Sequence, residues 1–186
     1  MKKSILASLA ILLAINLPAG NVPSGLTGLW RFQNSADKLK ATVGFDATNS
    51  VAGNAAWLTG PWTVIDPGLS DGGIVQDQSN EYLTVNPAFA ANGGGSYVNE
   101  YTIAWDVKPD QNWNSLYQTA LNGRDNDADL WINASTQTAA TIGVGDVGYS
   151  ASTFDATKWH RIVLSVANGS FFRVFVDGTL MLDGAG

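Results

Sequence analysis

Short blocks of hydrophobic residues, many of them alternating with polar residues, follow one another along most of this 186-residue chain. Glycine, asparagine and aspartate interrupt these blocks, and beyond the first twenty residues no segment spaces its apolar residues as a helix would over three turns. A period of two is typical of strands, and the interrupting residues are typical of turns. The pattern therefore predicts an all-β protein.

The strongest pattern lies in the last third of the chain. Residues 159–166 (WHRIVLSV) and 171–176 (FFRVFV) are rich in β-branched and aromatic side chains, and each run is followed by a turn pair, Asn168-Gly169 and then Asp177-Gly178. Asn-Gly and Asp-Gly beside such runs are the strongest short-range signal for a hairpin. These residues predict an antiparallel meander.

Alternation also assigns the two faces of each predicted strand. The residues expected to share the apolar faces are Ile103, Trp105 and Val107, then His160, Ile162, Leu164 and Val166, and finally Phe172, Val174 and Val176. Each strand then has an apolar side for a core between two sheets and a mixed side for solvent or ligand. The predicted fold class is an antiparallel two-sheet β-sandwich.

The residue pattern of these strands resembles that of a known family. A Trp-His pair opens one strand and Phe-Val-Asp-Gly closes the next, as in the laminin-G-like, pentraxin-like branch of the concanavalin A-like jelly rolls. Upstream, residues 28–32 (GLWRF), 80–85 (NEYLTV) and 101–109 (YTIAWDVKP) follow the order of that family's strands. The resemblance covers residues 26–186 and is strongest at Trp105 and from Trp159 to Gly178. It implies a jelly roll, a fold that does not by itself assign a function.

The resemblance also creates an expectation about the C-terminal part of the sandwich. In the family, at least one further strand follows the turn expected at Asp183-Gly184 and closes a sheet, whereas here only Ala185 and Gly186 follow. Two expectations follow: a truncated product whose sandwich lacks its closing C-terminal strand, or a closing strand that is supplied differently. An unpaired sheet edge favours association with other chains.

The first twenty residues have the layout of a secretory signal peptide. Lys2 and Lys3 precede an apolar run from Ile5 to Leu17, and Pro18-Ala19-Gly20 ends it. The run is shorter than the ~20 residues that a membrane span needs, although an uncleaved anchor is the alternative. We predict a signal peptide over 1–20 and one laminin-G-like jelly-roll domain over 21–186, in a protein that is secreted, periplasmic or on the cell surface and has no membrane contact after cleavage.

Charge and cysteine content exclude several classes of function. Loss of Lys2 and Lys3 leaves 8 of the 10 basic residues against 16 acidic ones, a net charge of −8. Such a surface repels polyanions, so nucleic acid is not an expected partner. The chain has no cysteine, which excludes disulfides, thiolate zinc sites and cysteine nucleophiles.

The acidic segment 124–131 (RDNDADLW) contains the candidate metal ligands Asp125, Asn126 and Asp127. It is not an EF-hand, because Leu130 and Thr136 stand where that loop needs its glycine and its bidentate glutamate. The resemblance implies calcium as the cofactor, held at the rim of the sandwich by Asp and Asn from separate loops. A polar turn that leads into a strand over 130–133 is the alternative.

Sugar binding has a different signature, in which aromatic rings cover the apolar face of a pyranose and polar groups lie alongside. The chain holds seven tryptophans. Alternation places Trp131 and Asn133 on one face of a strand, and Trp113 and Tyr117 lie on or beside an expected loop over 112–115. The candidate ligand-binding residues are Trp131, Asn133, Trp113, Tyr117 and Arg124. Packing in the core is the alternative role for any single tryptophan.

Two enzymatic functions of the same fold remain as alternatives. A glycoside hydrolase needs paired carboxylates, and the only glutamates, Glu81 and Glu100, lie in separate segments. A lyase needs a base, and the sole histidine, His160, falls on an apolar face where a structural hydrogen-bonding role is the commoner one. We therefore predict no catalytic residue and an exported binding or adhesion module for a glycan. The third hypothesis is a structural domain that contacts extracellular proteins.

Overall fold

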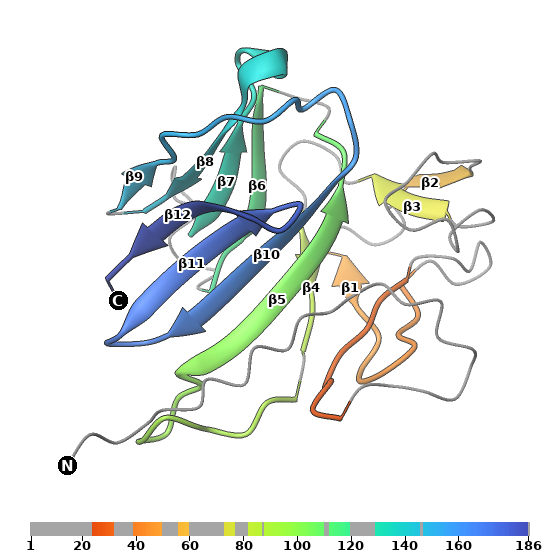
Figure 1. Ribbon diagram of the computed structural model, residues 1–186. Helices are drawn as coiled ribbons and strands as arrows, with labels where there is room; N and C mark the ends of the chain where they lie inside the picture. The colour runs from red at the N-terminus through yellow and green to blue at the C-terminus, as the bar shows by residue number, and fades with distance from the viewer. Residues whose placement is uncertain are drawn as a thin grey trace. The chain divides into compact units, whose positions relative to one another are not determined.

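The computed structural model describes residues 24–31, 39–49, 56–59, 73–76, 82–86, 88–109, 112–119, 129–145 and 147–185. Contacts divide the chain into two compact units, one that contains Ala91–Gly186 and one that is Leu13–Ala90. Strands dominate the described residues (Figure 1), and the helical element among them is the short 3-10 helix η2, Gln137–Ala139. No helix in these ranges is long and apolar enough to cross a membrane. The predicted leader, residues 1–20, lies outside them.

The first sheet of the Ala91–Gly186 unit has the order β12-β11-β10-β5. Its strands are β5 (Glu100–Val107), β10 (His160–Ala167), β11 (Phe171–Val176) and β12 (Thr179–Gly184), and each neighbouring pair is antiparallel. Figure 1 shows them side by side. The strands predicted from alternation over 101–107, 159–166 and 171–176 are confirmed. Strand β12 is an addition, and the turn expected at Asp183-Gly184 is wrong because these residues end β12.

Two tight turns connect β10, β11 and β12. Asp177 and Gly178 both have positive φ, 50° and 80°, which is the geometry of the two-residue turn that Asp-Gly favours. At the other turn, the Ser170 N–H donates to the Ala167 carbonyl at 2.9 Å, and Gly169 supplies a φ of 76°. The antiparallel meander predicted from these turn residues is confirmed.

The second sheet of the same unit has the order β6-β7-β8-β9. Its strands are β6 (Trp113–Tyr117), β7 (Leu130–Asn133), β8 (Thr141–Val144) and β9 (Gly148–Tyr149), again all antiparallel. The strand predicted over 130–133 is confirmed. The loop expected over 112–115 is wrong, since β6 begins at Trp113.

One hydrophobic core fills the space between the two sheets. The largest fully buried side chains come in equal number from the second sheet and from the first: Leu130, Ile132 and Ile142, then Ile162, Leu164 and Val174. Their burial confirms the face assignments made by alternation. The unit is therefore an antiparallel two-sheet β-sandwich, as the sequence predicted.

The unit Leu13–Ala90 contains shorter pairings. Strand β1 (Thr48–Asn49) pairs with β4 (Leu83–Thr84), and β2 (Ala56–Thr59) pairs with β3 (Gly73–Gln76). Of the two strands that the resemblance places here, the described residues of the one at 80–85 contain β4, and those of the one at 28–32 contain a bridge between Leu29 and Val43.

Candidate functional site

The outer face of the second sheet carries most of the predicted sugar-binding residues that the structure describes. In an antiparallel sheet, residues directly opposite one another point to the same side. The register gives two rows across the strands, Trp113–Asn133–Thr141 and Ser115–Trp131–Gly143–Tyr149. Trp113, Trp131 and Asn133, which come from two separate strands, therefore share one face.

Three aromatic rings on this side form a cluster that we call the aromatic face: Trp113, Trp131 and Tyr149. The Tyr149 ring lies 5.9 Å from the Trp131 ring at 82° and 6.5 Å from the Trp113 ring at 62°, as measured between centroids. Trp113 is 55% exposed and Tyr149 is 52% exposed. Large exposed apolar side chains that lie next to one another are typical of an interaction surface.

Gly143 is the reason that the Trp131 indole can lie across the sheet. A Cβ built on Gly143 would lie 2.2 Å from Nε1 and 2.3 Å from Cε2 of Trp131, so the ring occupies the space where any other residue has its side chain. Gly143 does not have positive φ, so the position needs glycine for space. The buried indole N–H of Trp131 has no hydrogen-bond acceptor within the described part of the chain.

Polar groups without formal charge lie next to the rings. The Oδ1 atom of Asn133 accepts from the backbone N–H of Ser135 at 3.1 Å and from its hydroxyl at 2.7 Å. These two bonds fix the amide, so that its NH2 group is the side still free to donate among the described contacts. Asn133 lies between Trp113 and Thr141 in its row, which places an amide donor beside the exposed indole and a hydroxyl one strand further along.

Tyr117 does not belong to the aromatic face, although simple alternation from Trp113 would put it there. The register shifts between Ser115 and Tyr117, and Tyr117 therefore lies opposite the buried Leu130. Its ring packs 6.2 Å from Tyr101 and 6.1 Å from Trp105 of the other sheet. Burial, more than the hydrogen bond with Tyr101, raises the pKa of Tyr117 well above its usual value. Tyr117 is thus an inter-sheet packing residue in this structure.

Sequence reasoning did not single out Tyr149 or Gly143. Strand β9 has only two residues, too few to show an alternation. The signal available was weak: a lone tyrosine beside glycines in the run 143–149. Their role follows from the pairing of β8 with β9, where Gly143 and Tyr149 are direct partners.

The predicted metal ligands and one predicted sugar ligand cannot be placed. Asp125, Asn126, Asp127 and Arg124 lie outside the described residues. Within the ranges that are described, no three His, Asp or Glu side chains gather closely enough to hold a metal ion.

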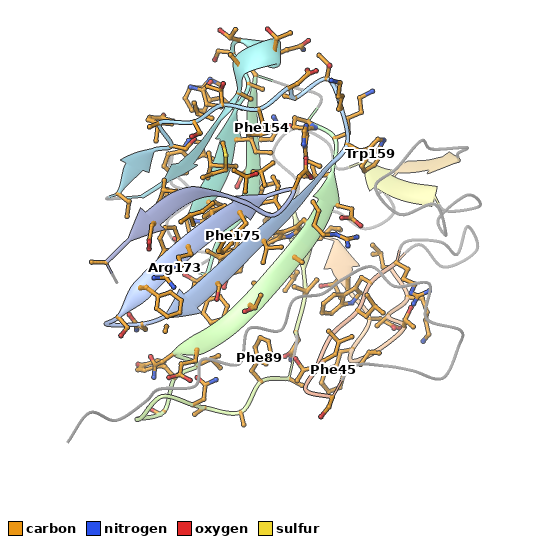
Figure 2. All side chains as sticks on the ribbon, viewed as in Figure 1. Phe45, Phe89, Phe154, Trp159, Arg173 and Phe175 are labelled. Atoms are coloured by element: carbon orange, nitrogen blue, oxygen red, sulfur yellow. The ribbon has the colours of Figure 1, made fainter. Side chains whose placement is uncertain are left out.

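His160 is held inside the fold by both of its ring nitrogens. Nδ1 lies 2.7 Å from a carboxylate oxygen of Asp177, and Nε2 lies 2.6 Å from the backbone carbonyl of Asp155. The edge of Phe154 packs against the ring at 4.8 Å, and Figure 2 labels Phe154 near this end of the sandwich. Both ring nitrogens therefore have a partner within the fold. This is the geometry of a structural histidine.

The outer face of the first sheet carries ion pairs beside its aromatic rings, Phe171 and Phe175. Arg161 and Asp106 are direct cross-strand partners, joined by two hydrogen bonds of 2.7 and 2.6 Å. Arg173 binds Asp183 at 3.1 Å and stacks 4.5 Å from the centre of the Phe171 ring. Figure 2 shows Arg173 on β11 of this sheet. These charges pair with one another within the sheet.

No family model, no curated protein and no solved structure matches the chain. The described residues define an all-β antiparallel two-sheet sandwich. Its most distinctive described surface is the aromatic face on β6, β7 and β9.

Proposed function

We propose that this protein is a non-catalytic binding module whose aromatic face recognises a glycan. The observation that carries the proposal is the exposure of Trp113 and Tyr149 beside Trp131 on an open sheet face, with Asn133 and Thr141 alongside. Pyranose rings have apolar faces that pack on aromatic rings, and their hydroxyls need neutral donors and acceptors nearby. The aromatic face offers both.

We also propose that the sandwich is a concanavalin A-like, laminin-G-like jelly roll in an exported protein. The resemblance at Trp105 and from Trp159 to Gly178 supports the fold type, because Trp105 lies in β5 and the segment 159–178 contains β10, β11 and the turns beside them, in the order that the family has. The pattern of residues 1–20 supports export. The ligand would then be an extracellular or cell-envelope glycan.

Calcium enters the proposal through Asp125, Asn126 and Asp127. Its support is the resemblance and the oxygen-rich sequence. These residues precede β7, which carries Trp131, so an ion there would order the chain that leads into the aromatic face.

A glycan array tests the proposal. The purified full chain would be screened with calcium and with EDTA, together with Trp113→Ala, Tyr149→Ala, Asp127→Ala and, as a matched control, Tyr97→Ala. Tyr97 is a 77% exposed aromatic residue that is not one of the three rings of the aromatic face. We expect binding that Trp113→Ala and Tyr149→Ala abolish and Tyr97→Ala preserves. Loss of binding in EDTA and in Asp127→Ala would support the calcium proposal.

Two results would overturn the proposed function. A folded protein that binds no glycan would favour a domain that contacts proteins. Release of new chain ends from a bound polysaccharide would favour the enzyme alternative. The described environment of His160 argues against its use as a catalytic base, since both ring nitrogens are engaged within the fold.

A further inference from the structure

The second sheet is free of formal charge throughout its described length. None of the residues 112–117, 130–145 and 147–154 is Asp, Glu, Lys, Arg or His. In the sequence, Asp146 is the only charged residue between Leu130 and Phe154. The first sheet, by contrast, carries Arg161, Asp106, Arg173 and Asp183 on its outer face.

This distribution matters for the kind of ligand that the aromatic face can hold. Carboxylate and sulfate groups on a glycan are bound by Arg and Lys, which offer charge-assisted hydrogen bonds. The described part of the second sheet has neither residue, and the whole chain has a net charge of −6. An anionic glycan would therefore meet repulsion from the net charge, and the described residues of this face offer it no compensating cation.

The polar groups that are present suit hydroxyls. The Asn133 amide is fixed by Ser135 with its NH2 group left as donor, and the Thr141 and Ser115 hydroxyls both donate and accept. Trp113 shares its row with Asn133 and Thr141, and Trp131 and Tyr149 share theirs with Ser115. Trp113 and Tyr149 are exposed on the outer face of the sheet. A polysaccharide can therefore lie across this face while both of its ends extend past the edges of the sheet.

We infer that the ligand is an internal stretch of an uncharged polysaccharide, held across β6 to β9 by ring packing and neutral hydrogen bonds. This inference rests on the proposed function and adds the class of glycan. A contact without ionic partners is not screened by salt. Affinity for the polysaccharide is therefore expected to be nearly independent of ionic strength.

The experiment compares two uncharged polysaccharides, mixed-linkage β-glucan and galactomannan, with two anionic ones, polygalacturonate and chondroitin sulfate. Binding to the full chain would be measured by calorimetry at about 20 mM and about 500 mM NaCl, a range over which exposed ionic contacts weaken strongly. We expect an uncharged polymer to bind with less than a twofold change between the two salt concentrations. Trp113→Ala and Tyr149→Ala would weaken it at least tenfold, in keeping with the weight of aromatic residues at interfaces, and Tyr97→Ala would leave it unchanged.

The outcomes separate this inference from the proposed function. If an anionic polymer binds through Trp113 and Tyr149 and is released by salt, the uncharged-ligand inference is overturned and the glycan-binding function stands. If short oligosaccharides bind as tightly as the polymer through a chain end, the internal-stretch part of the inference is overturned. If no glycan of either kind binds the folded protein, both proposals fail.

Discussion

The two sheets of the sandwich share one core, yet among the described residues only the first sheet has ion pairs on its outer face, beside its own aromatic rings. On the first sheet, Arg161 with Asp106 and Arg173 with Asp183 neutralise one another across neighbouring strands. On the second sheet, Trp113 and Tyr149 stand exposed beside uncharged polar groups. Charged groups that pair with each other have few hydrogen bonds left to offer a ligand. Exposed aromatic rings favour binding, because covering their apolar surface lowers the free energy of the complex.

The largest effect on stability is expected from substitutions in the core between the two sheets. Ile132 and Leu164 are buried on the inner faces of the second and the first sheet. Ile132→Ala and Leu164→Ala should each lower the free energy of unfolding by about 2–5 kcal/mol, because each leaves a cavity in the same core. Urea unfolding followed by tryptophan fluorescence measures both. A near-zero effect of either variant would mean that its sheet does not unfold with the other.

The next effect separates the outer faces. The Arg161 side chain is 15% exposed and that of Asp106 is 26% exposed, so Arg161→Ala removes a charged hydrogen-bond pair that is largely shielded from water. We expect a loss of about 1–2 kcal/mol of stability, part of it recovered in the double variant with Asp106→Ala. Trp113→Ala, on the exposed aromatic face, should cost less stability than Arg161→Ala. The reverse order would show that the aromatic face serves folding.

A substitution at Gly143 tests how the aromatic face is built. Gly143→Ala places a methyl group where the Trp131 indole lies, so the ring must move. We expect at least a tenfold loss of glycan affinity, about 1.4 kcal/mol. In a Trp131→Ala background the same substitution should change affinity little, because the clash is gone. Additive losses in the double variant would argue against the indole contact as the cause.

The smallest effect on stability is expected at Asp155, in the connection between β9 of the second sheet and β10 of the first, and it appears only at acidic pH. Hydrogen bonds from Lys158 and Thr157 lower the pKa of Asp155 from 3.8 to about 2. The folded state therefore holds the carboxylate more strongly than the unfolded state does, so this stabilisation is present above pH 3.8 and is lost as the pH falls towards 2. Asp155→Asn should remove that pH dependence, as measured by thermal unfolding between neutral pH and pH 2. Parallel curves for the two proteins would contradict it.

Local patterns in the sequence predicted much of the sandwich, because strand period and turn chemistry are properties of neighbouring residues. The alternation over 171–176 and the pair Asp177-Gly178 fix a strand and a tight turn without reference to the rest of the chain. The same reasoning placed Trp131 with Asn133 opposite Leu130 and Ile132. It did not extend to Tyr117, for which the sequence predicted only a place on or beside a loop. A register shift inside β6 sets the side on which Tyr117 lies, and such a shift has no signature in the residues of that strand.

The candidate site depended more on pairing between strands than on any one strand. The sequence by itself determined the class of fold, the inner face of each long strand and the absence of thiol chemistry, since each follows from composition or from a period of two. Only the tertiary structure brought Tyr149 against Trp113 and Trp131 and opened room for the indole at Gly143. Those contacts join segments that are distant in the chain, and they exist only once β8 pairs with β7 and β9.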